Sequence, residues 1–384
     1  MNSTELIQKA RTIHCERFGI EPTWAAVAPG RVNLIGDHTD YTGGFAMPFA
    51  VDRFTVALAS PGPSGQHAIY ATSVAEQIDI DTDRVAEPAP SGSWHDYVRG
   101  VVALMRQTGV SHAGLCITLH GNVPIGRGLS SSASLELALA TLLEAASGLA
   151  IDPIEKVRVC QSAENLYTGM PCGILDQYSV CMAQDAKLMM LDCRDVSSVS
   201  VDIRTDDVGV LVADSGVRHE LTDGQYAARR QECHAAEEML GAYLRDADAT
   251  ALQAIDDETV FLRARHVVTE NRRVLAMREA LSQDRYEEAG RLMNESHASL
   301  RDDFQSSCVE VDALVDVCNS TSGIFGARMT GGGFGGSVVA LVRRDQAETA
   351  SVAIQRDYRS ATGLTTEPAS VSPVAGAMQV HIDA

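Results

Sequence analysis

Residues 121–134 read GNVPIGRGLSSSAS, between a strand-like segment at 114–120 and a helical, Leu- and Ala-rich segment at 131–147. Glycines let a backbone approach a ligand closely, and the serines fall at the N-terminus of the helix. Free N–H groups and the positive end of the helix dipole favour a phosphate there, and serine hydroxyls can ligate Mg²⁺. A plain turn with N-capping serines would have the same pattern. The motif GxxxxGK[ST] occurs nowhere in the chain, so this is not a Walker A loop.

A second polar cluster occupies 29–44 and lies between strand-like segments at 25–35 and 45–59. It contains an arginine, two aspartates, a histidine and a tyrosine within a short loop. Converging donors and acceptors of this kind suit a polyhydroxylated ligand, although polar loops between strands are often only solvated. The single histidine has no His-x-x-x-His partner, which argues against a zinc site.

A glycine cluster at 331–336, GGGFGG, fits the pattern GxGxxG. A dinucleotide-binding fingerprint needs a strand before this pattern and a helix after it. Here a strand-like segment follows at 336–342, so the sequence excludes a Rossmann fold and a dehydrogenase. The glycines are better explained by a backbone turn beside a ligand or another loop.

A fourth stretch, 164–178, has Gly and Pro residues between two helical segments and places Asp176 in the opening turn of the second. A helix start favours an ionised carboxylate, although most first-turn aspartates have no further role. Elsewhere, further helices and strands are expected, with helices at 3–18, 94–108, 153–168, 223–243, 257–281 and 284–298 and strands at 186–191, 208–213 and 323–330. The change from strand-rich to helix-rich sequence near residue 200 predicts two domains, 1–203 and 204–384.

The composition and charge of the chain argue against several classes of function. The chain of 384 residues has 31 basic and 51 acidic residues, a net charge of −20, which argues against nucleic-acid or membrane-surface binding. No apolar run approaches the ~20 residues that span a bilayer. The nine cysteines form no CxxC pair, and the N-terminus lacks a signal-peptide core, so a cytoplasmic protein with reduced thiols is expected. We expect a monomer or weak homodimer.

The motifs together resemble a known family. GRVNLIGDHTDYTGG at 30–44, VPIGRGLSSSAS at 123–134 and MTGGGFGG at 329–336 look like the three motifs of the GHMP small-molecule kinases, and within them of the galactokinase subfamily. Further similar stretches are GMPCGILDQ (169–177), SGVRHEL (215–221), YAARRQEC (226–233), RARHVVTENRR (263–273) and LMNESHASLRDDFQ (292–305). The resemblance implies a two-domain α+β fold, with the active site in the cleft between domains. It also implies ATP- and Mg²⁺-dependent phosphorylation of the anomeric hydroxyl of galactose.

The resemblance also implies roles for individual residues. Asp176 would be the base that faces the C1 hydroxyl of the sugar, and Arg31 would pair with it and stabilise the transferring phosphoryl group. Mg²⁺ would be held by Ser132 and Glu164, directly or through water. The ATP phosphates would bind the loop Gly126, Arg127, Gly128, Leu129, Ser130, Ser131 and Ser132. The sugar would bind Asp37, His38, Thr39, Asp40, Gly173 and Tyr226.

One residue departs from the pattern of the subfamily. Its motif usually reads Gly-Glu-His-Thr-Asp-Tyr, whereas this chain has Asp37. The missing methylene withdraws the carboxylate by roughly 1.3–1.5 Å, about one C–C bond. In the family this position faces the hydroxymethyl end of the sugar, so a kinase for L-arabinose or N-acetylgalactosamine is an alternative. A non-catalytic sugar sensor is a further alternative, but the complete set of predicted catalytic residues argues against it.

Overall fold

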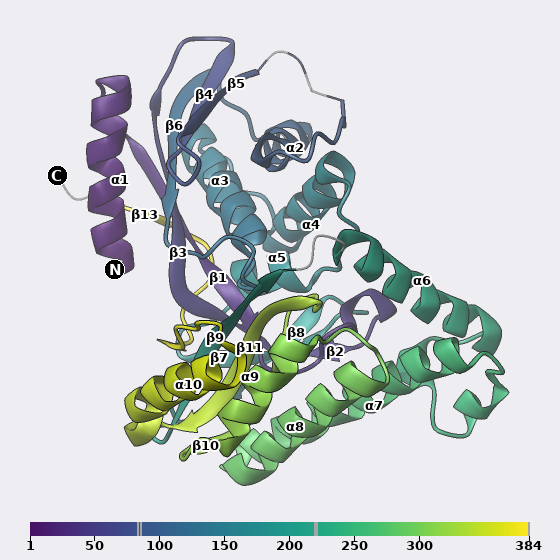
Figure 1. Cartoon of the computed structure of the whole chain (residues 1–384). Coiled ribbons are helices and arrows are strands. Elements are labelled where there is room, and N and C mark those ends of the chain that lie inside the picture. Colours follow the sequence, from purple (N-terminus) through teal and green to yellow (C-terminus); the bar gives the residue numbers. More distant parts are fainter. Residues whose placement is uncertain (83, 85–86, 219–221, 383–384) are drawn as a thin grey trace.

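The structure is a computed structural model and describes residues 1–82, 84, 87–218 and 222–382. Runs of strands and runs of helices follow one another along the chain, as is typical of the expected α+β class, and the strands form separate sheets (Figure 1). The stretch SGVRHEL ends at 219–221, which lie outside the described residues. In the part of the chain that is described, no helix is both long enough and apolar enough to cross a membrane.

The first sheet is built mainly from the N-terminal half of the chain. Its order is β13 (Met378–Val380), β1 (Trp24–Asn33), β3 (Pro48–Pro61), β6 (Gly114–Gly121), β4 (Gln66–Ala71) and β5 (Glu76–Asp81). Neighbouring strands are antiparallel except β4 and β6. The C-terminal strand β13 therefore returns to the N-terminal sheet and pairs with β1.

Helices cover both faces of this sheet (Figure 1). One face packs against α1 (Ser3–Phe18) through Leu6 and Ala10. The other packs against α2 (Trp94–Gln107), α3 (Ser131–Ser147) and α4 (Pro153–Ala163). Helix α1 ends at Gly19, as expected, and this residue has the left-handed conformation that closes helices.

The C-terminal half forms a second sheet with its own helices. The strand order is β10 (Ile324–Thr330), β11 (Gly335–Arg343), β9 (Val208–Arg218) and β12 (Ala369–Val371). Its helices are α6 (Thr222–Leu240), α7 (Glu258–Ser282), α8 (Tyr286–Asp302), α9 (Val309–Ser320) and α10 (Ala347–Thr362). Because β10 and β11 flank the glycine cluster and pair antiparallel, the expectation of a strand after that cluster is confirmed.

A small third sheet and several short helices complete the described chain. The sheet order is β2 (Phe45–Ala46), β7 (Lys187–Asp192) and β8 (Ser197–Asp202), beside α5 (Leu175–Met182). The short helices are η1 (Asp40–Thr42), the π-helical turn η2 (Glu164–Thr168), η3 (Leu244–Asp246), η4 (Ala251–Ala254) and η5 (Arg344–Gln346).

One hydrophobic core spans the two larger sheets. Val32 and Phe49 from the N-terminal sheet pack in the same buried cluster as Val274 of α7, Met293 of α8 and Val339 of β11. Burial of shared apolar surface is the main force that holds such layers together. The strand ends that carry the first motif are therefore fixed against the C-terminal helices and strands.

Candidate active site

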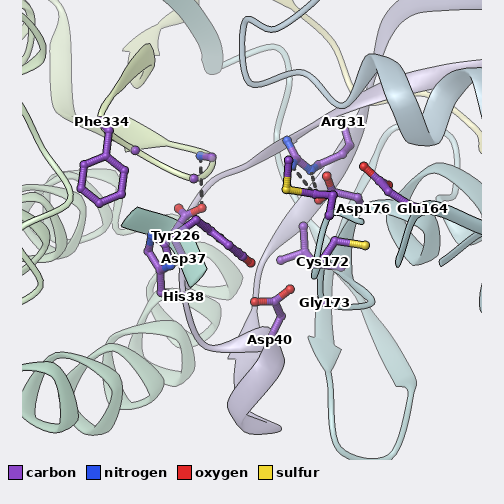
Figure 2. Close-up of a pocket in the computed structure, with 15 residues that line it drawn as sticks. Arg31, Asp37, His38, Asp40, Glu164, Cys172, Gly173, Asp176, Tyr226 and Phe334 are labelled. Atoms are coloured by element: carbon purple, nitrogen blue, oxygen red, sulfur yellow. Dashed lines mark hydrogen bonds and ion pairs between the residues drawn. The ribbon is translucent and has the colours of Figure 1, made fainter. Parts of the chain in front are cut away.

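Two cavities meet between the two larger sheets. The small cavity has a volume of about 240 Å³ and is lined by the polar loop at 37–40, the loop at 172–176, Tyr226 and the glycine cluster (Figure 2). The large cavity has a volume of about 560 Å³ and is lined by the glycine-serine loop and by Trp94 and Tyr97 of α2. The residues common to both linings are Arg31, Glu164, Met170, Asp176, Gly331 and Gly332.

Arg31 and Asp176 form an ion pair where the cavities meet. Arg31 Nε and Nη2 lie 2.7 Å and 2.6 Å from Asp176 Oδ1, while Arg31 Nη1 donates to the carbonyl of Gly128 at 2.6 Å. The second carboxylate oxygen, Oδ2, accepts a hydrogen bond from Ser130 Oγ at 2.6 Å. The arginine is buried, whereas 27% of the Asp176 side chain remains exposed. The carboxylate is thus oriented from two sides and still open to the cavities.

Ser130 explains why the N-terminus of α3 is available to a ligand. It occupies the N-cap position with a left-handed φ of 52°, and its hydroxyl does not cap the helix. The hydroxyl is turned to Asp176 instead, so the alternative of an ordinary capping serine is wrong for this residue. Ser131 and Ser132 follow it along the wall of the large cavity. An anion at this helix end would meet unpaired N–H groups and the positive dipole end.

The other residues of the predicted phosphate loop have different surroundings. Gly126 and Gly128 line the large cavity, and Gly128 has a left-handed φ of 73° that favours glycine. Arg127 and Leu129 are not among the residues that line it. The Arg127 side chain instead pairs with Asp214 of β9 at 2.8 Å, and the Leu129 carbonyl accepts the backbone N–H of Arg31.

Asp37 lies at one end of the small cavity and is held by the C-terminal half. Its Oδ2 is 2.5 Å from Nη2 of the fully buried Arg328, and its Oδ1 accepts the backbone N–H of Gly331 at 3.2 Å. Burial raises the pKa of Asp37, and the Arg328 charge opposes that rise. The shortened carboxylate therefore has two fixed partners before any ligand binds.

His38 and Tyr226 form an aromatic side of the small cavity (Figure 2). The His38 ring lies 5.5 Å from the Tyr226 ring and 4.4 Å from the Phe304 ring, and its Nδ1 is 3.0 Å from the Tyr41 hydroxyl. Burial lowers the pKa of His38 to about 3, so the ring is neutral near pH 7. Thr39 does not line either cavity, because its buried hydroxyl is directed to the carbonyls of Gly36 and Phe45.

Asp40 and Gly173 are in close contact on another side of the small cavity. A Cβ atom at Gly173 would overlap Asp40 Oδ2, so only glycine leaves room for the carboxylate there. Burial, with the negative charge of Asp176 as a further cause, raises the pKa of Asp40 to about 6. The two carboxylates therefore repel each other across the cavity.

Glu164 lies beside Asp176 and is the first residue of the π-helical turn η2 (Figure 2). Such turns often occur at functional sites. Burial, then the Asp176 charge, raises the pKa of Glu164 to about 7, while hydrogen bonds from Ser132 and Gln177 oppose the rise. Within the described ranges no group of three or more His, Cys, Asp or Glu side chains is arranged to hold a metal ion. Glu164 and Ser132, which both line the large cavity, could offer a cation one carboxylate and one hydroxyl.

Several residues that support the site were not predicted. Glu270 of α7 accepts the backbone N–H of Gly36 at 2.9 Å and the Ser296 hydroxyl of α8 at 2.6 Å, and Asn271 accepts the N–H of Phe45 at 2.7 Å. They fix the backbone on both sides of the polar loop. Glu270, Asn271 and Ser296 lie in the stretches at 263–273 and 292–305 that resemble the family, so this resemblance could have indicated them.

The arrangement suits transfer of a charged group onto a hydroxyl. The small cavity offers carboxylates, an imidazole and a phenol to a hydroxylated ligand, and the large cavity ends at a helix N-terminus suited to phosphate. Between them, Asp176 can orient a hydroxyl and accept its proton, and Arg31 can offset negative charge. These are the functional groups that phosphoryl transfer requires.

Family models match three segments of the chain. They are described as the galactokinase galactose-binding signature at residues 12–61, the GHMP kinases N terminal domain at 96–184 and the GHMP kinases C terminal domain at 277–360. The first segment includes the polar loop, the second the glycine-serine loop and Asp176, and the third the glycine cluster.

Individual relatives agree with these models. Galactokinase from Homo sapiens is 40% identical over 367 residues, which cover 92% of each chain, and galactokinase from Actinobacillus succinogenes is 37% identical over 93% of this chain and 94% of its own. The crystal structure of Lactococcus lactis galactokinase complexed with galactose has a TM-score of 0.92 and 30% identity, and covers 97% of this chain and 100% of its own. A mevalonate kinase structure shares the fold, with a TM-score of 0.69 and 16% identity over 91% of this chain and 99% of its own.

Proposed function

This chain belongs to the galactokinase family, and from that premise we propose that it transfers the terminal phosphoryl group of ATP to the anomeric hydroxyl of galactose, giving galactose 1-phosphate and ADP. The observation that carries the proposal is the position of the Arg31–Asp176 pair, which borders both cavities. A hydroxyl bound in the small cavity and a phosphate bound in the large one would meet at this pair. Such positioning is the main source of catalysis in phosphoryl transfer.

We propose that the small cavity binds the sugar. Asp37, His38, Asp40 and Tyr226 offer both donors and acceptors to its hydroxyls, and Gly173 leaves the room that Asp40 needs. Thr39 would contribute indirectly, because its hydroxyl contacts backbone carbonyls within the loop.

We propose that the large cavity binds ATP. Its phosphates would lie at the N-terminus of α3, against the backbone of Gly126 and Gly128 and the residues Ser130 to Ser132. Arg127 and Leu129 would act through the loop backbone, since Arg127 is paired with Asp214 and Leu129 is buried. Trp94 and Tyr97 provide an apolar surface for the base farther along the cavity.

In the proposed mechanism Asp176 orients the C1 hydroxyl and accepts its proton. The hydroxyl oxygen forms a bond to the terminal phosphorus while the bond from that phosphorus to the bridging oxygen of ADP breaks. Arg31 offsets the negative charge of the phosphoryl group during its transfer, because a guanidinium is a planar, positively charged donor. The two contacts of Arg31 to Asp176 Oδ1 fix the guanidinium and the carboxylate relative to each other.

The residues present fit Mg²⁺ as a partner of the nucleotide. Ser132 and Glu164 supply hard oxygen donors, and the buried Glu164 carboxylate has a pKa raised to about 7, which a nearby cation would lower. Mg²⁺ is usually bound by one or two carboxylates together with substrate phosphates, so a group of three acids is not needed. When bound, the ion would neutralise charge on the phosphates.

Two further properties are proposed. The chain divides near residues 203 and 204 into domains 1–203 and 204–384, with β13 returning to the first sheet. A reducing, cytoplasmic compartment is supported by the nine cysteines, all of which are free in the structure.

The direct test is ADP release in the presence of ATP, Mg²⁺ and a panel of monosaccharides: galactose, L-arabinose, N-acetylgalactosamine and glucose. We expect the highest kcat/KM for galactose. L-arabinose is the second candidate, because it lacks the hydroxymethyl group near which the shortened Asp37 would lie. Binding of galactose and ATP without ADP release from any sugar would contradict the proposal and favour a sensor.

A further inference from the structure

Gln177 joins two buried acids beside the reaction site. It is the third residue of α5 and is fully buried. Its amide nitrogen donates to Glu164 Oε2 at 2.6 Å and to Glu136 Oε2 at 3.0 Å. A side-chain amide nitrogen has two hydrogens, so it can serve one acid with each. The reverse orientation of the amide would place its oxygen against two carboxyl groups.

We propose that Gln177 is a positioning residue for cation binding, which holds the Glu164 carboxylate in place while Glu136 prevents the amide from rotating. The inference rests on the proposed role of Glu164 as a Mg²⁺ ligand. It adds two residues, Gln177 and Glu136, that do not line either cavity.

An amide is better suited to this position than a cationic side chain. A lysine or arginine would form an ion pair with Glu164 and compete with Mg²⁺ for its charge. The amide donates a hydrogen bond and leaves the negative charge of the acid in place. Because Gln177 follows Asp176 directly, the first turn of α5 also fixes the proposed base and the proposed cation ligand relative to each other.

Glu136 has the properties of an anchor rather than of a ligand. It lies on α3 one helical turn beyond Ser132 and is fully buried. Its Oε2 accepts the hydrogen bond from Gln177 at 3.0 Å, and its side chain lines neither cavity.

The test measures cation binding without turnover. The Mg²⁺ concentration that half-saturates binding of a non-hydrolysable ATP analogue is determined by calorimetry in the absence of sugar. Gln177→Met keeps the approximate size of the side chain and removes both N–H groups. We expect this variant to need about tenfold more Mg²⁺, which is the lower end of the effect of losing a residue that orients a metal ligand. The dissociation constant for galactose should change less than twofold. Gln184→Met, at an exposed glutamine near Ser200, is the matched control and should match the wild type.

Two variants of Glu136 separate positioning from general destabilisation. Glu136→Gln keeps an acceptor for Gln177 and should have a Mg²⁺ requirement within twofold of the wild type. Glu136→Leu removes the acceptor and should raise the requirement about threefold. An equal Mg²⁺ requirement in these two variants would overturn the proposal, even if Gln177→Met failed to fold. A wild-type Mg²⁺ requirement in a folded Gln177→Met variant would also overturn it.

Glu164→Gln distinguishes this inference from its premise. If that variant raises the Mg²⁺ requirement and Gln177→Met does not, the cation site stands and the positioning role of Gln177 fails. If Glu164→Gln has no effect, the assignment of the cation site fails and the inference fails with it.

Discussion

Arg31 places two nitrogens on the same oxygen of Asp176, at 2.7 Å and 2.6 Å, and thereby leaves the other oxygen to Ser130. The acid is a residue of α5, the arginine of β1 and the serine of the turn before α3. These three elements must therefore be correctly placed relative to one another for the carboxylate to face the small cavity. This dependence makes the pair the most informative place to test the proposed chemistry.

Asp176→Ala and Arg31→Ala should lower kcat far more than they weaken nucleotide binding. Both residues would act on the transferring group, and interactions specific to the transition state appear in kcat. We expect a loss on the order of 10²–10⁴-fold for Asp176→Ala, the range for a general base. The measurements are kcat by ADP release and the dissociation constant of ATP by calorimetry. Near-wild-type turnover in Asp176→Ala would refute the assigned base.

Ser132→Ala should raise the Mg²⁺ concentration needed for half-maximal activity about tenfold, because one oxygen donor is lost. Ser134→Ala is a suitable comparison, since its hydroxyl contacts Ala28 and Thr55 inside the protein and lines neither cavity. That variant should lower Tm and leave the Mg²⁺ titration unchanged. Identical Mg²⁺ titrations for both variants would remove Ser132 from the cation site.

Gly173→Ala should abolish galactose binding and spare the nucleotide. The added methyl group would overlap the Asp40 carboxylate and force it out of position. Calorimetry with each ligand separately checks this. Gly224→Ala, at an α6 position with open space around it, should bind galactose as the wild type does. If Gly173→Ala bound galactose normally, the contact between Asp40 and the sugar would be ruled out.

Galactose affinity should depend on pH through Asp40. Its pKa is raised from the ordinary value of 3.8 to about 6, so the acid is neutral below pH 6 and ionised above it. The ionised form accepts hydrogen bonds from hydroxyls at both oxygens, so the dissociation constant should rise as pH falls through 6, by up to tenfold per pH unit. Asp40→Asn should bind more weakly but lose this dependence between pH 5 and 7. A dependence that persists in Asp40→Asn would assign it to another group.

The sequence predicted elements with strong periodicity or clear ends. Helix α3 and its glycine-serine loop were found because a run of good helix formers follows a turn of glycines and serines. Strands β4 and β5 were missed although QHAIYA and EQIDID have the alternation of buried and more exposed positions that is typical of strands, because each segment is only six residues long. The three-residue strand β13 has no local signal, because its pairing with β1 joins the two ends of the chain.

In the site, residues within a continuous motif were accessible to prediction, whereas their distant partners were not. Arg328 is the largest fully buried side chain, and its contact with Asp37 depends on how β10 meets the polar loop. Gln177 lies within the stretch at 169–177 that resembles the family, but its partners lie on α3 and η2. Such contacts depend on tertiary packing, which spacing along the chain does not encode.

The contact between Arg328 and Asp37 limits how the Asp37 carboxylate can bind a sugar. Each oxygen of Asp37 already has a partner, because Oδ2 contacts Nη2 of Arg328 and Oδ1 accepts the N–H of Gly331. Each oxygen can still accept one further hydrogen bond. Asp37→Glu would extend the carboxylate by roughly 1.3–1.5 Å, about one C–C bond, toward the hydroxymethyl end of the sugar. A site that binds a hydroxyl tightly rejects analogues without it, because its own polar groups are then left unpaired.

We therefore expect the wild type to prefer galactose but to tolerate 6-deoxygalactose and L-arabinose better than Asp37→Glu does. In that variant kcat/KM for galactose should rise by a factor worth about 1 kcal/mol, the order of one net hydrogen bond. The measurement is kcat/KM for the three sugars on both proteins, with Tm as a check that the Arg328 contact survives. Equal ratios between the sugars in two proteins of equal Tm would mean that Asp serves as well as Glu, for instance through a bridging water, and the specificity argument would fail.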